Sequence, residues 1–234
     1  MTNTKTTNDF SSVKVIFFDL YRTLAYSTCR EPIYDAKSAL GYHFGCQQEF
    51  LDYCLTTKAN SLSEFVLRTS RKFNVSSYSV NFARFAQVVE ADTLGTKLYD
   101  DVLPVLTSLK LAGYKIGIIS NVWQFPIKYI QNLFGDNLID AFIASCEVGL
   151  AKPDKRIFDV ALARLNTSCD EALMIGDNLD QDIKASQNAG LPALLLDREN
   201  RYGSCDLPCL KITDLYELTN YLGFGQTSQS NKVA

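Results

Sequence analysis

Four short runs of the sequence carry side chains that could do chemistry together. They are DLYRTL at 19–24, SN at 120–121, KP at 152–153 and GDNLDQD at 176–182. Carboxylates gathered in one place repel each other unless a cation neutralises them, and Mg2+ prefers oxygen ligands of this kind. A hydroxyl and an ammonium group beside such a cation would bind an anion. If the four runs meet, the pattern predicts a site for Mg2+ and a phosphoryl group.

The elements that must position these runs are short strands alternating with helices. Apolar segments predict strands at 13–20, 115–119, 140–145, 172–175 and 192–196. Apolar residues at helical spacing predict helices at 100–112, 126–134, 153–165, 182–189 and 213–222. This alternation is typical of an α/β fold, a Rossmann-like, doubly wound parallel sheet with helices on both faces. Ligands bind outside the carboxyl ends of such strands, so the four runs are expected to converge there.

One stretch departs from the alternation and defines the domain organisation. From 27 to 98 the pattern is helical throughout, with Ser61-x-x-Glu64 as a capping box. It predicts an all-helical subdomain inserted after the first strand. The expected divisions are a flexible arm at 1–12, core segments at 13–26 and 99–222, the helical subdomain at 27–98 and a flexible tail at 223–234.

Composition excludes several classes of protein. The chain has 234 residues, 47% of them hydrophobic and 21% charged, and a net charge of -3. The slight acidic excess predicts no basic surface for nucleic acid. No apolar run approaches the roughly 20 residues of a membrane span, and the N-terminus lacks the apolar core of a secretory signal. Seven cysteines without zinc-type spacing are typical of free thiols in a reducing compartment, so a soluble, cytoplasmic protein is expected.

The order of the four runs resembles that of the haloacid dehalogenase-like (HAD) hydrolase superfamily. The similarity extends over about residues 13–222 and implies a Rossmann-like core with a mobile cap. The helical stretch lies between Asp19 and Ser120, which resembles members with one helical cap inserted after the first motif. The resemblance implies a Mg2+-dependent phosphatase that acts on a small phosphorylated metabolite. The composition predicts no nucleic acid or membrane partner.

The resemblance also implies a role for individual residues. Asp19 would be the nucleophile that forms an aspartyl-phosphate, and Lys152 would pair with it and with the phosphate charge. The residues implied to bind phosphoryl oxygens are Thr23, Ser120, Asn121 and Lys152. The residues implied to hold Mg2+ are Asp19, Tyr21 through its backbone carbonyl, Asp177 and Asp182. Asp182 could instead support Lys152.

Tyr21 departs from the phosphatase pattern, in which an aspartate two residues after the nucleophile acts as general acid and base. A tyrosine with a pKa of about 10 is a poor base at neutral pH. Loss of a positioned acid or base typically lowers the rate by about 10²–10⁴-fold. Phosphatase activity slowed at this step is therefore expected.

Two other functions remain open because of Tyr21. One is a metal-free 2-haloacid dehalogenase, in which tyrosine occupies this position. Against it, no arginine occurs between Arg30 and Arg68, Phe158 stands where those enzymes have tyrosine, and the fourth run keeps its carboxylates. The other is a catalytically weakened member that serves as a binding protein. Phosphonate cleavage is less favoured than either, since no cap lysine is identifiable as a Schiff-base former.

Further candidates lie outside the four runs. His43, the single histidine, lies in a predicted turn where capped relatives face the substrate. Arg68, Arg71 and Lys72 form a basic cluster that could bind a substrate anion or simply face solvent. Trp123 either lines the cleft or covers the next helix. The oligomeric state and the natural substrate are left open.

Overall fold

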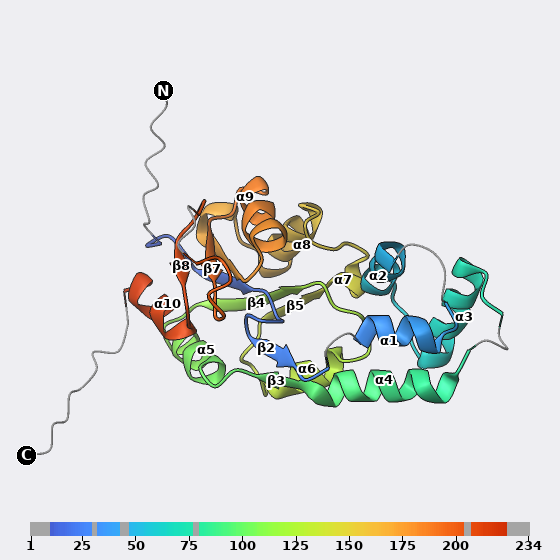
Figure 1. The fold of residues 1–234 in the computed structure, drawn as a ribbon. Coiled ribbons are helices and arrows are strands. Elements are labelled where there is room, and N and C mark those ends of the chain that lie inside the picture. Colours follow the sequence, from blue (N-terminus) through green and yellow to red (C-terminus); the bar gives the residue numbers. More distant parts are fainter. Residues whose placement is uncertain (1–9, 30–31, 43–46, 77–79, 204–206, 224–234) are drawn as a thin grey trace, which may run out of the picture.

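A six-stranded parallel sheet forms the centre of the structure (Figure 1). The computed structural model describes residues 10–29, 32–42, 47–76, 80–203 and 207–223. The strands are β1 (Val15–Phe18), β4 (Lys115–Ser120), β5 (Ala141–Ala144), β6 (Ala172–Gly176), β7 (Ala193–Leu196) and β8 (Lys211–Ile212). Their order in the sheet is β5-β4-β1-β6-β7-β8, and all neighbours are parallel. The five predicted strands are confirmed, whereas β8 has two residues and is too short to show a periodicity.

Helices cover both faces of the sheet, which confirms the predicted doubly wound α/β fold. Ile16 and Phe18 of β1 pack into the core on one face, and Val15 and Phe17 pack into the core on the other. The first face is covered by α5 (Val102–Leu111), α6 (Ile127–Leu133) and α10 (Leu215–Tyr221), the second by α8 (Arg156–Leu165) and α9 (Ala185–Asn188). Because both faces are buried, β1 is apolar at every position.

Four helices gather at one end of the molecule, beyond the sheet (Figure 1). They are α1 (Pro32–Ala39), α2 (Gln47–Thr56), α3 (Leu62–Phe73) and α4 (Phe82–Gly95), here named the helical unit. The short strands β2 (Ala25–Ser27) and β3 (Thr96–Leu98) pair antiparallel and join this unit to the core. The Ser61 hydroxyl accepts a hydrogen bond from the Glu64 N–H at 3.1 Å, which confirms the predicted cap of α3. That the helical unit is a mobile cap stays a prediction.

Two predicted helices begin elsewhere in the structure. The helix predicted at 153–165 begins at Arg156, because the Asp154 N–H first closes a turn on the Ala151 carbonyl; the Lys152–Pro153 peptide within this turn is cis. A π-helical turn, Leu179–Lys184, precedes α9 where the helix 182–189 is predicted. The short helix α7 (Ser145–Val148) and the 3-10 turn Cys169–Glu171 are too brief for a periodicity to reveal.

The predicted arm and tail lie outside the described residues, apart from residues 10–12 and 223. Among the helices that are described, none is long and apolar enough to cross a membrane.

Candidate active site

Side chains from three neighbouring strands meet at the carboxyl edge of the sheet. Asp19 directly follows β1, Ser120 ends β4 and Asp177 directly follows β6. Since β4, β1 and β6 are adjacent and parallel, their ends lie side by side. Lys152 reaches the same edge from the turn after α7, and Asp182 reaches it from the π-helical turn. The predicted convergence of the four runs is thus what the structure has.

Lys152 links two of the carboxylates. Its Nζ donates to Asp19 Oδ1 and to Asp182 Oδ1, each at 2.6 Å. Burial alone would lower the pKa of Lys152, but the Asp182 and Asp19 carboxylates raise it above its ordinary value. Burial raises the pKa of Asp19 to about 7, against the opposing effect of Lys152. The lysine therefore remains an ammonium and is the main group that favours an ionised Asp19.

Asp19, Asp177 and Asp182 form a buried cluster in which one oxygen of each lies within 4.8 Å of the others. Arg201 donates to the Asp177 carboxylate and, at 2.8 Å, to its backbone carbonyl. Burial and the neighbouring Asp182 raise the pKa of Asp177, while Arg201 lowers it. With Lys152 and Arg201 as the cations, three carboxylates leave an excess of negative charge. Oxygen donors with such an excess fit a hard divalent cation.

The position of Asp182 depends on a glycine at the end of β6. A side chain at Gly176 would place its Cβ 2.4 Å from the Asp182 carboxylate. Asp182 Oδ2 accepts a hydrogen bond from the Asn178 N–H at 3.0 Å, and Oδ1 is bound by Lys152. Both oxygens of Asp182 are thus engaged, which favours the reading that it supports Lys152.

Asn121 holds the backbone of Lys152. Its Oδ1 accepts from the Lys152 N–H at 2.7 Å, and its Nδ2 donates to the Lys152 carbonyl at 2.8 Å. This two-point clamp fixes the turn that carries the ammonium group. The predicted contact between Asn121 and a phosphoryl oxygen stays a prediction.

The hydroxyl of Thr23 is buried without a hydrogen-bond partner among the described residues. The residue as a whole is fully buried. A buried unsatisfied hydroxyl costs about 1–3 kcal/mol. The predicted contact between this hydroxyl and a phosphoryl oxygen would supply an acceptor and stays a prediction. Ser120, the other predicted hydroxyl ligand, is 1% exposed at the end of β4.

Tyr21 points toward the helical unit. Its hydroxyl lies 3.2 Å from Thr96 Oγ1, and burial together with the charge of Asp92 raises its pKa well above its ordinary value. Its phenol is therefore no base at neutral pH, as the sequence predicts.

Two functional candidates were missed in the sequence, Arg198 and Arg201. Arg201 binds Asp177, and Arg198 donates to the Thr23 carbonyl at 2.9 Å. Both follow Asp197, a buried carboxylate directly after β7 that accepts the Arg201 N–H at 2.7 Å. An aspartate directly after a strand, as at positions 19 and 177, is the signal that could have identified this loop.

The candidates outside the four runs have different outcomes. His43 lies outside the described residues. The side chains of Arg68 and Lys72 are 51% and 52% exposed and pair with glutamates of the helical unit. Neither they nor Arg71 are among the described residues that line the cavity beside the site. Trp123 is 2% exposed and lines this cavity.

Comparison with known proteins identifies the family of this chain. A family model described as haloacid dehalogenase-like hydrolase matches residues 13–190. A glyceraldehyde 3-phosphate phosphatase of Methanothermobacter thermautotrophicus is 34% identical over 104 residues, which are 43% of this chain and 45% of that protein. The chain thus spans about half the length of the curated relatives it matches.

Two solved structures are similar in fold at low identity. A HAD phosphatase from Thermococcus onnurineus has a TM-score of 0.62 at 24% identity and covers 91% of this chain and 99% of its own. A 2-haloacid dehalogenase from Pseudomonas syringae pv. Tomato also has a TM-score of 0.62, at 21% identity, with 90% and 98% covered. The fold therefore does not decide between phosphate hydrolysis and dehalogenation. Because the family match spans more than half of the chain, this protein belongs to the haloacid dehalogenase-like hydrolases.

Proposed function

We propose that this protein is a Mg2+-dependent phosphatase that hydrolyses a small phosphate monoester through an aspartyl-phosphate at Asp19. The observation that carries the proposal is the buried cluster of Asp19, Asp177 and Asp182, with the Lys152 ammonium between two of its members. The curated relatives similar to this chain include phosphatases, which supports the same chemistry.

The donor set suits the cation. Asp19 and Asp177 would hold Mg2+, with the Tyr21 backbone carbonyl as a further predicted ligand. Asp182, whose two oxygens accept from Lys152 and from the Asn178 N–H, would support Lys152. When bound, Mg2+ would neutralise negative charge on the phosphoryl oxygens.

Asp19 would act as the nucleophile. Its Oδ1 is held by Lys152, which leaves Oδ2 to attack phosphorus. The Asp19 O–P bond forms as the bond from phosphorus to the alcohol oxygen breaks, and the alcohol departs with a proton from solvent. Lys152 and the Thr23 hydroxyl would bind phosphoryl oxygens during this step. Water then attacks the aspartyl-phosphate, which releases phosphate and restores the carboxylate.

Tyr21 makes the second half of this cycle slow. The phenol hydroxyl pairs with Thr96 and has a raised pKa, so it does not deprotonate the attacking water. We expect the aspartyl-phosphate to form faster than it is hydrolysed.

Rapid mixing with an aryl phosphate tests the proposal. We expect a burst of one phenol per enzyme that requires Mg2+, followed by slower turnover. Asp19→Asn should abolish both phases, because its amide is not a nucleophile for phosphorus. A burst that survives in Asp19→Asn, or that is independent of Mg2+, would contradict the proposal.

A metal-free dehalogenase is the second candidate, favoured by the tyrosine at position 21. In that reaction Asp19 would attack carbon and displace halide. Release of chloride from a 2-chloro acid in the presence of a metal chelator, with no aryl phosphate burst, would select this function. Binding of Mg2+ and phosphate with neither reaction would select a binding protein.

A further inference from the structure

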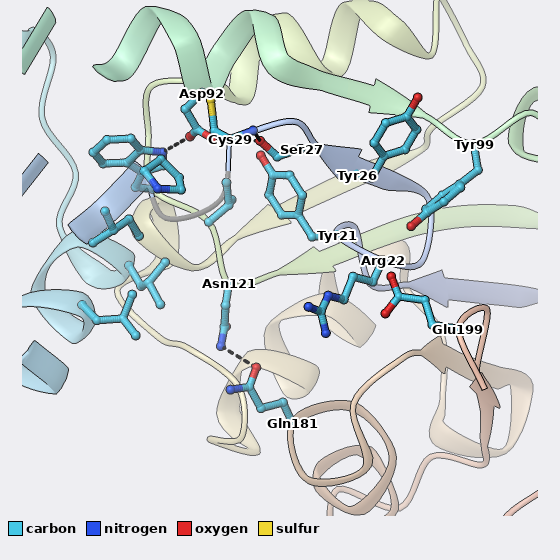
Figure 2. A pocket seen from close by; sticks show the side chains of 16 residues that line it. Tyr21, Arg22, Tyr26, Ser27, Cys29, Asp92, Tyr99, Asn121, Gln181 and Glu199 are labelled. Atoms are coloured by element: carbon cyan, nitrogen blue, oxygen red, sulfur yellow. Dashed lines mark hydrogen bonds between the residues drawn. The ribbon is translucent and has the colours of Figure 1, made fainter. Parts of the chain in front are cut away.

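Beyond the site at the strand ends lies a cavity of about 620 Å³ between the core and the helical unit. Residues of the first, second and fourth runs border it, including Tyr21, Asn121 and Gln181 (Figure 2). The helical unit and the segment leading into it contribute Cys29, Ile33, Leu51, Leu55 and Asp92. An alcohol group attached to a phosphate at Asp19 would therefore extend into this cavity.

We propose that Asp92 is a specificity-determining residue that binds an ammonium group on the alcohol part of the substrate. The substrate class would then be a phosphate monoester of an amino alcohol. This inference rests on the proposed phosphatase function, which it extends from the reacting phosphate to the rest of the substrate.

Asp92 is a buried carboxylate with few partners. Its residue is 3% exposed, yet it lines the cavity. Oδ2 accepts a hydrogen bond from Trp123 Nε1 at 2.7 Å, and Oδ1 has only the Ser27 hydroxyl at the long distance of 3.5 Å. Within the described part of the chain, no cation pairs with it. A carboxylate can accept about four hydrogen bonds, so this cavity-lining side chain has unused capacity.

Burial of an unpaired charge is unfavourable, and this cost points to the kind of ligand. Burial raises the pKa of Asp92, while the Trp123 and Ser27 hydrogen bonds lower it only in part. A ligand ammonium beside Oδ1 would supply the missing counter-charge in a site of low dielectric. A neutral alkyl group would leave the carboxylate as poorly paired as before.

The remaining wall of the cavity favours a cation over a second anion. Arg22 is the single basic residue among the described residues that line it, and Glu199 lies on the same side of the cavity (Figure 2). Tyr26, Tyr99 and Trp123 supply aromatic rings. Aromatic faces attract ammonium groups, whereas an additional carboxylate or phosphate beside Asp92 would be repelled by it.

Three isosteric esters test the inference. Aminopropyl phosphate carries an ammonium group where n-butyl phosphate carries a methyl group, and hydroxypropyl phosphate carries a neutral donor. Steady-state kcat/KM with Mg2+ should favour the amino ester over the butyl ester by about 10- to 100-fold, the size of a charge-assisted hydrogen bond. Asp92→Asn keeps an acceptor for Trp123 and should remove most of this preference. Glu90→Gln, a charge change on the exposed face of the same helix, should retain it.

Binding to the Asp19→Asn variant separates this inference from the proposed function. Calorimetric titration of the three esters should give the same order of affinity without turnover, and the order should be lost in Asp19→Asn/Asp92→Asn. Preferential binding of the amino ester, with no hydrolysis by the natural protein, would retain Asp92 as the ammonium site and reject the phosphatase. Equal affinity for the amino ester and either of the other two would overturn the inference. So would an equal loss for all three esters in Asp92→Asn.

Discussion

At the scale of single residues, the site is a balance of buried charges. The Lys152 ammonium donates to both Asp19 and Asp182, and Asn121 holds the Lys152 backbone in place through hydrogen bonds. A buried charge that loses its partner destabilises a protein strongly, so these contacts must form together. Among the described residues, the Thr23 hydroxyl is buried without a hydrogen bond, and its contact with a phosphoryl oxygen stays a prediction.

Tyr21 gives a prediction at this scale. Tyr21→Phe removes only the hydroxyl contact with Thr96, so we expect unchanged turnover of an aryl phosphate and a loss of about 1 kcal/mol in unfolding free energy. Tyr21→Asp introduces the general acid and base of the phosphatase pattern, which this chain lacks at position 21, and should raise steady-state turnover by up to about 10²–10⁴-fold. Stopped-flow and steady-state assays measure both effects, with circular dichroism as the control for folding. Loss of activity in Tyr21→Phe would show that the phenol takes part in the reaction.

At the scale of elements, the loops after the strands hold one another in place. Arg198, after β7, forms two 2.9 Å hydrogen bonds with the Asp101 carboxylate ahead of α5. It also donates to the carbonyl of Thr23 after β1. Asp101 in turn accepts the first N–H of α10, from Leu215, at 2.8 Å. One guanidinium thus ties the loop of the first run to two helices that cover the sheet.

Removing the Arg198 guanidinium should lower the free energy of unfolding strongly. Arg198→Met leaves the Asp101 carboxylate buried without a cation, and we expect the unfolding free energy to fall by about 3–5 kcal/mol in urea titrations. Arg156→Met, which breaks the exposed pair with Asp154, is the matched control and should change it by less than about 1 kcal/mol. Arg198→Met/Asp101→Asn should recover part of the loss, since no buried charge is left unpaired. Equal effects of the two single variants would contradict this account.

At the scale of the whole molecule, an aromatic cluster joins the helical unit to the core. Phe65 and Phe85 of the helical unit lie 5.8 Å apart, and Phe125 of the core packs edge-on to both at 5.2 and 5.9 Å between ring centroids. Trp123, beside Phe125, donates to Asp92 of α4. Asp92, which we propose to bind the substrate ammonium group, is therefore also part of the contact between the helical unit and the core. Its charge should influence the stability of the whole fold.

The pH dependence of stability follows from the direction of the Asp92 shift. Burial raises its pKa above the ordinary value of 3.8, so over an interval of pH the folded protein holds a proton that the unfolded chain has released. The stability linked to this proton is fully present below pH 3.8 and is lost as pH rises through the raised pKa. Asp92→Asn cannot lose a proton, so its unfolding free energy relative to the natural protein should increase as pH rises. Urea titrations of both proteins at a series of pH values measure this difference, in which other titrating groups cancel. A difference that is flat or decreases with pH would contradict the prediction.

The pattern of apolar and polar residues along the sequence predicted much of the architecture. Apolar runs of strand length, helical spacing and the motif residues at strand ends predicted the α/β fold and the meeting of Asp19, Lys152 and Asp177, because parallel strands bring their carboxyl ends to one edge. The same reasoning found the helical stretch between β2 and β3. Short elements such as β8 and α7 escaped it, since a period cannot be read from two to four residues.

Only the tertiary structure decided which partners each side chain has. The pairing of Arg198 with Asp101, of Arg201 with Asp177 and of Trp123 with Asp92 joins residues from separate elements. Residue spacing along the chain does not predict such contacts, because they depend on how elements pack across the sheet and how the helical unit packs on the core. The sequence thus predicted the candidate reacting groups and the edge of the sheet where they meet. Packing decided how their charges are balanced and which carboxylate faces the cavity where a substrate would lie.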